Sequence, residues 1–201
     1  MLLTSVQTDL IEAGCDEAGR GCLAGPVCAA AVILPPNYQL KDLNDSKKLS
    51  EKKRDQLRPI IERDAIAWSV VMVDENDIDK LNILHASIEG MHRALHTLSV
   101  KPEFIAVDGN RFKPFESIPH QTVVKGDGKY LNIAAASVLA KTHRDEYMHQ
   151  LHNQYPHYNW LRNKGYPTAE HIEALETFGR CIHHRSSFSI KSKQLSLWPL
   201  N

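Results

Sequence analysis

The chain has 201 residues, 42% of them hydrophobic and 24% charged, and its formal net charge is zero. This size and composition favour one globular domain and exclude a disordered chain. No apolar run approaches the ~20 residues that span a bilayer, and the first ten residues lack the basic start of a signal peptide. We therefore expect a cytoplasmic protein with no membrane contact.

Five segments have the short apolar, β-branched or aromatic composition of strands. They are residues 10–16, 27–34, 65–73, 104–108 and 120–127. We expect the first three strands to form an antiparallel meander. We expect the last two, each reached through a helix, to add in parallel to the same sheet.

Four segments carry helical spacing or helix-capping signals. They are residues 50–63, 82–98, 131–155 and 168–178. Together the elements predict an α/β fold, in which helices flank a mixed five-stranded sheet and the C-terminal part, from about residue 156, is helical. We expect one domain over residues 1–190, a tail over 191–201 and a monomeric protein.

The four cysteines give no sign of a metal site. They are Cys15, Cys22, Cys28 and Cys181, and no two are spaced as Cys-x-x-Cys. A zinc knuckle is therefore not expected. We interpret all four as reduced structural residues, because free cysteine behaves as a small buried hydrophobe.

Charge is unevenly distributed along this neutral chain. After Glu176 no acidic residue follows and the charged side chains are basic, and residues 41–58 are rich in Lys and Arg. Local basic patches are typical of nucleic-acid enzymes whose acidic groups gather in the active site. From charge alone, an ordinary solvated surface explains these patches equally well.

Carboxylates follow three of the predicted strands. Asp16 and Glu17 end the first, Asp108 the fourth and Asp127 the fifth. If these strands are neighbours, the carboxylates converge, and their mutual repulsion calls for a cation. Magnesium and manganese prefer carboxylate oxygens, and two such ions ~4 Å apart suit phosphodiester hydrolysis. A single Asp after a strand is usually a turn residue or helix cap, so this hypothesis depends on the order of strands.

Six motifs are distributed along almost the whole chain: DEAGRGCLAGPV (16–27), DSKKL (45–49), VDGN (107–110), KGDGKYLNIAAASVLAK (125–141), GYPT (165–168) and HRSSF (184–188). They resemble the motifs of ribonuclease HII and occur in the same order. The resemblance implies a ribonuclease H-like fold and a catalytic mechanism with two Mg²⁺ or Mn²⁺ ions. It also implies that Asp16, Glu17, Asp108 and Asp127 form the catalytic and metal-binding set.

The resemblance further implies an endonuclease that cuts on the 5′ side of ribonucleotides. Its substrates would be RNA–DNA hybrids and DNA duplexes with embedded ribonucleotides, and its products would carry 3′-hydroxyl and 5′-phosphate ends. Gly19-Arg20-Gly21 would read the 2′-hydroxyl, and Tyr166 would pack on the ribose. The candidate phosphate contacts are Lys47, Ser137, Lys141 and Arg185.

Several alternatives stay open. Asp145 is a rival for the fourth carboxylate, although a mid-helix ion pair with a neighbour is its ordinary explanation. A dinucleotide-binding loop also fits GRGCLA, but the turn leads to a strand and lies beside two acids. A type 3 ribonuclease H would share the acidic set, yet only fifteen residues precede Asp16, and that family typically has an N-terminal substrate-binding domain. A non-catalytic nucleic-acid-binding protein with a structural cation is the alternative of a different class.

The C-terminal segment Gln194–Leu200, QLSLWPL, resembles the short peptides that bacterial proteins insert into the DNA sliding clamp. Such peptides place a few apolar anchors in a groove. Packing of the same apolar residues onto the domain is an equally good explanation.

Overall fold

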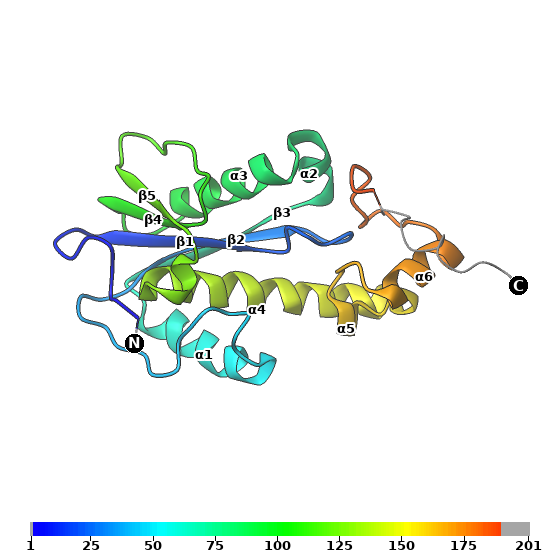
Figure 1. Cartoon of the computed structure of the whole chain (residues 1–201), viewed down its shortest axis with the longest axis horizontal. Helices are drawn as coiled ribbons and strands as arrows, with labels where there is room; N and C mark the ends of the chain where they lie inside the picture. Colours follow the sequence, from blue (N-terminus) through cyan, green and yellow to red (C-terminus); the bar gives the residue numbers. More distant parts are fainter. Residues whose placement is uncertain (1, 190–201) are drawn as a thin grey trace, which may run out of the picture.

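The computed structural model describes residues 2–189, which form a mixed five-stranded sheet between helices (Figure 1). The strands are β1 (Glu12–Ala18), β2 (Val27–Ile33), β3 (Ala67–Val73), β4 (Phe104–Asp108) and β5 (His120–Val123). Their order in the sheet is β3-β2-β1-β4-β5. The first three are antiparallel, whereas β4 pairs in parallel with β1 and β5 with β4, as the sequence predicts.

One predicted connection is wrong. The chain reaches β4 through the helices α2 (Glu75–Leu81) and α3 (Ile83–His96), but it reaches β5 through a loop at residues 109–119. Phe115 and Ile118 of this loop are buried and form an isolated bridge. They pack into the core formed with α3, so the loop covers apolar surface where a helix was expected.

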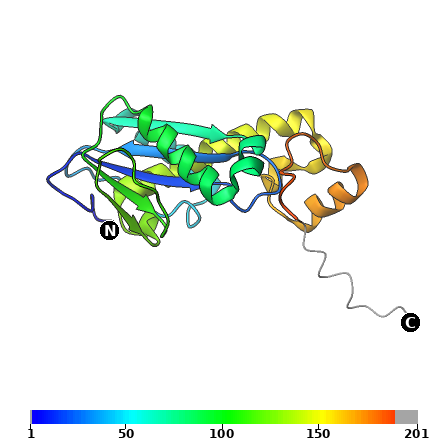
Figure 2. The ribbon, with the colours of Figure 1, turned by 90° about the horizontal axis from the view of Figure 1, so that it is seen from above.

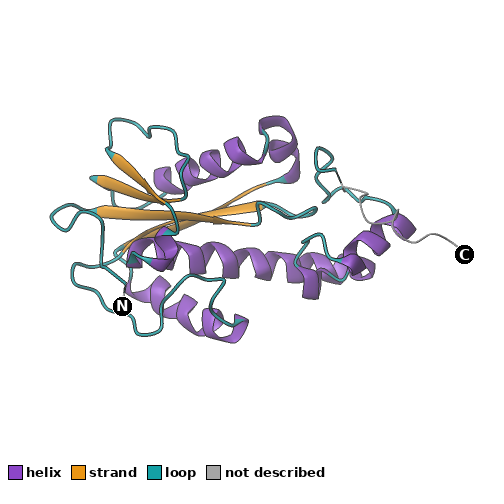
Figure 3. Ribbon diagram, in the orientation of Figure 1, coloured by secondary structure: helices purple, strands orange, loops and turns teal. Residues whose placement is uncertain are grey.

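Helices cover both faces of the sheet. Figure 3 shows the strands as a central layer, with α4 (Leu131–Gln154) and α1 (Glu51–Asp64) on one side and α2 and α3 on the other. Successive residues of β2 alternate between the two cores, so the whole strand is buried and apolar. The helix α4 lies very close to β1, because a Cβ at Gly14 would lie 2.2 Å from the backbone carbon of Asn132.

The predicted helices are confirmed, and their ends carry the predicted caps. Ser50 accepts a hydrogen bond from the Lys53 amide, and Thr168 accepts one from the His171 amide at the start of α6 (Ala169–Phe178). The sequence analysis missed α2, because this helix is short and polar and ends at Asn82, the residue that also caps the start of α3. It also missed α5 (Trp160–Asn163) and the short 3₁₀ turns η1 (Gly126–Gly128) and η2 (Pro156–Tyr158).

The C-terminal helical part lies beyond one end of the sheet (Figure 2). It packs around Tyr158 and Trp160, which share a core with Leu23 of the β1–β2 loop and Met148 of α4. All four cysteines are free, as expected. No helix among the described residues is long and apolar enough to cross a membrane. The predicted tail, residues 191–201, lies outside the described part of the chain, and the division into domains stays a prediction.

Candidate active site

The acidic residues of β1 and β4 lie side by side at the centre of the sheet, although β1 continues past Asp16 and Glu17 to Ala18. In the parallel pairing of β1 with β4, Cys15 lies opposite Val107. Asp16 and Asp108 are the next residues of these two strands, and Glu17 follows Asp16. The order of strands on which the metal-site hypothesis depends is therefore the observed one.

Asp127 reaches the same place by a different route from the one expected. The strand β5 ends at Val123, which pairs with the last residue of β4, so residues 124–127 have no neighbouring strand. The chain turns instead, and Asp127 lies in η1. The Gly126 amide donates a hydrogen bond of 2.7 Å to Oδ1 of Asp108, which draws this turn against the acidic strand ends.

The carboxylates oppose one another's ionisation. Burial, followed by the charges of Glu17 and Asp108, raises the pKa of Asp16 well above its ordinary value. Burial also raises the pKa of Glu17, with Asp108 adding to the effect and Arg20 opposing it. Burial, Asp108 and Asp45 raise the pKa of Asp127 to about 6. A bound cation would relieve this repulsion.

The donor chemistry fits a hard divalent ion. Asp16, Glu17, Asp108 and Asp127 offer only carboxylate oxygens, the ligands that Mg²⁺ and Mn²⁺ prefer. Within residues 2–189, no three acidic, histidine or cysteine side chains are already arranged closely enough to coordinate one metal ion. The fit therefore rests on the donor type and on the burial and mutual repulsion that raise the pKa values of Asp16, Glu17 and Asp127.

Two basic side chains border the acidic set. Nη1 of Arg20 lies 3.0 Å from Oε1 of Glu17, and Nζ of Lys47 lies 3.9 Å from Oδ2 of Asp127. The Lys47 side chain is 80% exposed and that of Arg20 is 49% exposed. Both could therefore contact a substrate phosphate without leaving the site.

Asp45 is a site residue that the sequence reading missed. Its side chain hydrogen-bonds with Asp127 and helps to raise the pKa of that carboxyl group. Its Oδ1 also accepts a hydrogen bond of 2.9 Å from the Lys47 amide, which fixes the turn that carries Lys47. The available signal was the DSKKL motif, of which Asp45 is the first residue.

Ser137 and Arg185 are buried, and neither position supports the expected contact with phosphate. Ser137 lies beneath the acidic set, where its hydroxyl hydrogen-bonds to Asp16 and lies 2.8 Å from the hydroxyl of Ser46. Arg185 is fully buried, and its guanidinium donates hydrogen bonds to the carbonyls of Gly19, Arg20 and Gly25. Both residues hold neighbouring parts of the site in place.

A second buried arginine, Arg144 of α4, holds the same loop. It donates hydrogen bonds to the carbonyls of Ala24, Pro26 and Lys164, at 2.9 to 3.0 Å. A Cβ at Gly19, where φ is +94°, would lie 2.0 Å from Nε of Arg144, so this position requires glycine. No sequence signal pointed to this role of Arg144, because a mid-helix arginine is usually exposed.

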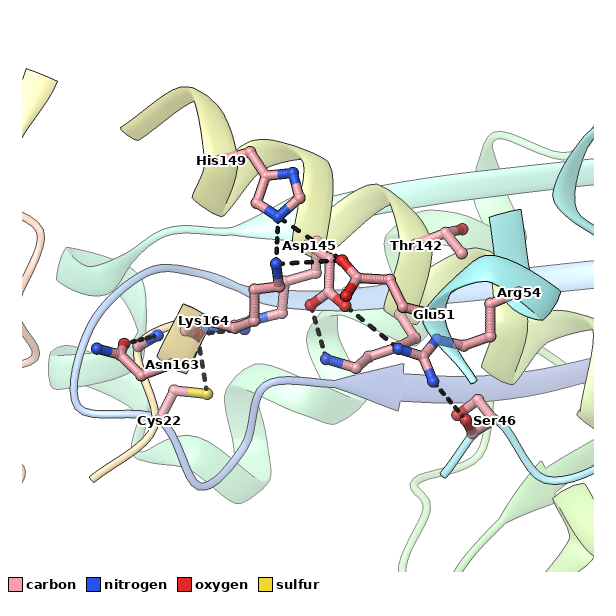
Figure 4. A network of polar contacts seen from close by, with 12 residues as sticks. Cys22, Ser46, Glu51, Arg54, Thr142, Asp145, His149, Asn163 and Lys164 are labelled. Atoms are coloured by element: carbon pink, nitrogen blue, oxygen red, sulfur yellow. Dashed lines mark hydrogen bonds and ion pairs between the residues drawn. The ribbon is translucent and has the colours of Figure 1, made fainter. Parts of the chain in front are cut away.

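Asp145 of α4 and Arg54 of α1 belong to a separate network of charges (Figure 4), which Lys141 joins through Asp145. Nζ of Lys141 lies 2.6 Å from Oδ1 of Asp145, and Nη2 of Arg54 lies 3.8 Å from its Oδ2. Arg54 also donates to the carbonyl of Ser46 and so supports the DSKKL segment. Asp145 is thus neutralised by two cations, whereas Asp127 faces the other acids.

Tyr166 lies beside this network, with its ring centroid 5.6 Å from Nζ of Lys141. The residue is 38% exposed. Burial of the hydroxyl and the neighbouring Cys22 raise the pKa of Tyr166 to about 12, so it is un-ionised at neutral pH. An exposed ring beside the glycine-rich loop can pack against a sugar.

Comparisons with known proteins agree with this geometry. Residues 13–191 match the family model for ribonuclease HII. A ribonuclease HII of Parabacteroides distasonis is 62% identical over 197 residues, which cover 98% of this chain and 99% of the relative. RNase HII from Archaeoglobus fulgidus, solved in complex with PCNA, is 26% identical with a TM-score of 0.78, covering 92% of this chain and 98% of that one. Ribonuclease H2 from Pyrococcus horikoshii is also 26% identical, with a TM-score of 0.75 and coverage of 88% and 93%. The chain therefore belongs to the ribonuclease HII family, whose members are endoribonucleases that depend on divalent metal ions.

Proposed function

We propose that the protein hydrolyses the phosphodiester on the 5′ side of ribonucleotides, both in RNA–DNA hybrids and at ribonucleotides embedded in DNA. The products carry a 3′-hydroxyl and a 5′-phosphate. The observation that supports this proposal most strongly is that the carboxylates of Asp16, Asp108 and Asp127 come together from β1, β4 and η1, with Asp16 and Asp127 buried and Asp108 partly buried.

Asp16, Glu17, Asp108 and Asp127 are the residues that would hold two Mg²⁺ or Mn²⁺ ions. When bound, such ions activate a water molecule and stabilise the leaving oxygen. The protein side chains fix where this happens. Ser137 and the Gly126 amide orient Asp16 and Asp108, so these carboxylates are placed before substrate arrives.

The glycine-rich loop is arranged to read the 2′-hydroxyl. Arg185 binds the carbonyls of Gly19 and Arg20 from inside the protein. Within the described residues, the amides of Arg20 and Gly21 have no hydrogen-bond partner, and both residues are exposed. These amides can donate to a ribose oxygen, and a Cβ at Gly21 would meet nothing within 4 Å. Tyr166 would pack on the same ribose.

Contacts to the substrate backbone come from the exposed cations. Lys47 fits this role best, because its ammonium lies in solvent next to Asp127. Arg20 can serve in the same way from the opposite side of the acidic set. Lys141, whose side chain is 18% exposed, is a weaker candidate because Asp145 already neutralises it.

A cleavage assay separates this proposal from a non-catalytic nucleic-acid-binding protein with a structural cation. A DNA duplex with one ribonucleotide is incubated with Mg²⁺, with Mn²⁺ or with chelator. We expect cutting only with metal, and none by Asp16→Ala or Asp108→Ala. Asp55→Ala, at an exposed site on α1, is the matched control and should cut normally. Duplex binding without cutting by the metal-loaded wild type would contradict the proposal.

We also propose that residues 1–190 act as a single monomeric domain and that Gln194–Leu200 binds a sliding clamp. The segment Gln194–Leu200 lies outside the described residues, so the proposal rests on its sequence. The Archaeoglobus fulgidus relative solved with PCNA is a precedent for a protein partner. Deletion of residues 194–201 should leave cleavage of short duplexes unchanged and abolish clamp binding in calorimetry. Full-length protein that shows no binding would contradict it.

A further inference from the structure

A pair of buried histidines lies behind the two segments proposed to read the ribose. His171 of α6 is fully buried and His184 is 5% exposed. Their Nε2 atoms lie 3.1 Å apart. Neither ring reaches the acidic set, and the proposed chemistry does not use them.

The partners of the two rings determine where each proton lies. Nδ1 of His171 lies 2.9 Å from the carbonyl of Tyr166, which can only accept, so this nitrogen carries a proton. Nε2 of His171 then has the lone pair, and it accepts from Nε1 of Trp160 at 3.1 Å. Nδ1 of His184 accepts from the Cys181 amide at 3.0 Å. Nε2 of His184 is therefore the protonated nitrogen, and it shares the single lone pair of His171 Nε2 with the Trp160 donor.

This arrangement leaves no place for another proton. A proton added to Nε2 of His171 or to Nδ1 of His184 would face an N–H group. Burial, and then the neighbouring His171, lower the pKa of His184 to about 4, and burial lowers the pKa of His171. Both rings stay neutral at physiological pH and act as fixed spacers.

The pair connects two segments that are far apart in sequence. On one side, His171 holds the peptide carbonyl of Tyr166. On the other, His184 forms an isolated bridge with Ala24 and precedes Arg185, which binds the carbonyls of Gly19 and Arg20. The two imidazoles therefore form a second link between Tyr166 and the glycine-rich loop, beside the hydrogen bond of 2.8 Å from the Leu23 amide to the Gly165 carbonyl.

We propose that His171, held by His184, is a positioning residue for recognition of the ribose: it fixes the Tyr166 peptide at the distance from residues 19–21 at which one ribose fits between them. The proposal rests on the function proposed above, in which these two segments contact the ribonucleotide. Lys47, the cation best placed to contact the backbone, lies beside Asp127 in the DSKKL segment, so we expect the pair to contribute little to overall duplex affinity.

The variant His171→Gln tests this proposal. A glutamine oxygen can occupy the place of Nε2 and still accept from Trp160 and His184, but the hydrogen bond to the Tyr166 carbonyl is lost. We expect kcat/KM at a single ribonucleotide to fall about tenfold, which corresponds to about 1.4 kcal/mol. Affinity for an all-DNA duplex should stay within about twofold. His157→Gln, also in the C-terminal part but without a hydrogen bond to the pair, is the control.

A double-mutant cycle with Tyr166→Ala decides whether His171 acts through the tyrosine. We expect His171→Gln to cause no further loss of kcat/KM once the Tyr166 ring is absent. Losses that multiply in the double variant would overturn the inference, because a merely structural role would reduce activity in either background. If His171→Gln does not fold, His184→Asn replaces it in the cycle: it keeps an acceptor for the Cys181 amide and loses the link to His171.

The same data separate this inference from the proposed function. If Tyr166→Ala cleaves a single ribonucleotide as well as the wild type, the ribose role of Tyr166 is wrong and the inference is overturned with it. If Tyr166→Ala is impaired and the two losses multiply, the inference alone is overturned.

Discussion

Replacing Asp127 by asparagine should stabilise the metal-free protein. The folded-state pKa of Asp127 is about 6, compared with an ordinary value of 3.8. At about 1.36 kcal/mol per pKa unit, the ionised carboxylate costs the folded state about 3 kcal/mol. Asparagine resembles the protonated acid in shape and has no charge, so Asp127→Asn should recover most of this free energy. For a chain of this length that is a rise in Tm of roughly 6 to 12 °C.

The stabilisation of the metal-free protein by Asp127→Asn should increase as the pH rises. Because the folded protein binds the Asp127 proton more tightly than the unfolded chain, wild-type stability falls as pH rises from about 4 through about 6. The advantage of Asp127→Asn should therefore be full at pH 8 and shrink towards pH 5. Thermal melts in chelator, with Asp55→Asn as a neutral control, measure it. A variant that melts below the wild type at pH 8, or an advantage that does not change with pH, would refute the reasoning.

Three further substitutions test other parts of the site. Lys47→Ala should weaken binding of every duplex to a similar extent and reduce the slope of log affinity against log salt by about 1, measured by fluorescence anisotropy at several salt concentrations. Asp145→Asn should lower Tm, because it leaves Lys141 and Arg54 without their anion, but the variant should still cut the substrate. Complete loss of cutting with normal stability would instead indicate that Asp145 is the fourth catalytic carboxylate. Arg185→Lys should lower Tm and cleavage together, since a lysine cannot bind the carbonyls that the guanidinium fork binds; unchanged melting would contradict its role in the loop.

The sheet and the acidic set could be predicted because their signals are local. Apolar and β-branched composition indicated the strands, and helical spacing with capping residues indicated the helices. Each acidic residue of the site could be seen in the sequence next to an apolar strand segment. Asp127 lies beside Asp108 as expected, but in a 3₁₀ turn and not at the end of a strand. The turn after Val123 depends on where β4 ends, and a single segment does not reveal where its partner strand stops.

The roles of the buried polar residues could not be predicted, because burial depends on tertiary contacts. Arg185 in HRSSF looked like a phosphate contact, since an arginine near a nucleic-acid site is usually exposed. In the structure its donors satisfy carbonyls of a loop some 160 residues earlier in the chain. The same holds for Arg144 and for the pair of His171 and His184, whose partners come from separate elements.

End-group analysis of the cleavage products tests the central claim most directly. A duplex with one ribonucleotide, labelled at either end of the cut strand, is incubated with Mg²⁺, and both new ends are identified. Attack by a metal-activated water predicts a 3′-hydroxyl on the upstream fragment and a 5′-phosphate on the ribonucleotide, with no product in chelator. A 2′,3′-cyclic phosphate, or a cut that persists in chelator, would show that the 2′-hydroxyl is the nucleophile and that the acidic set does not act as proposed.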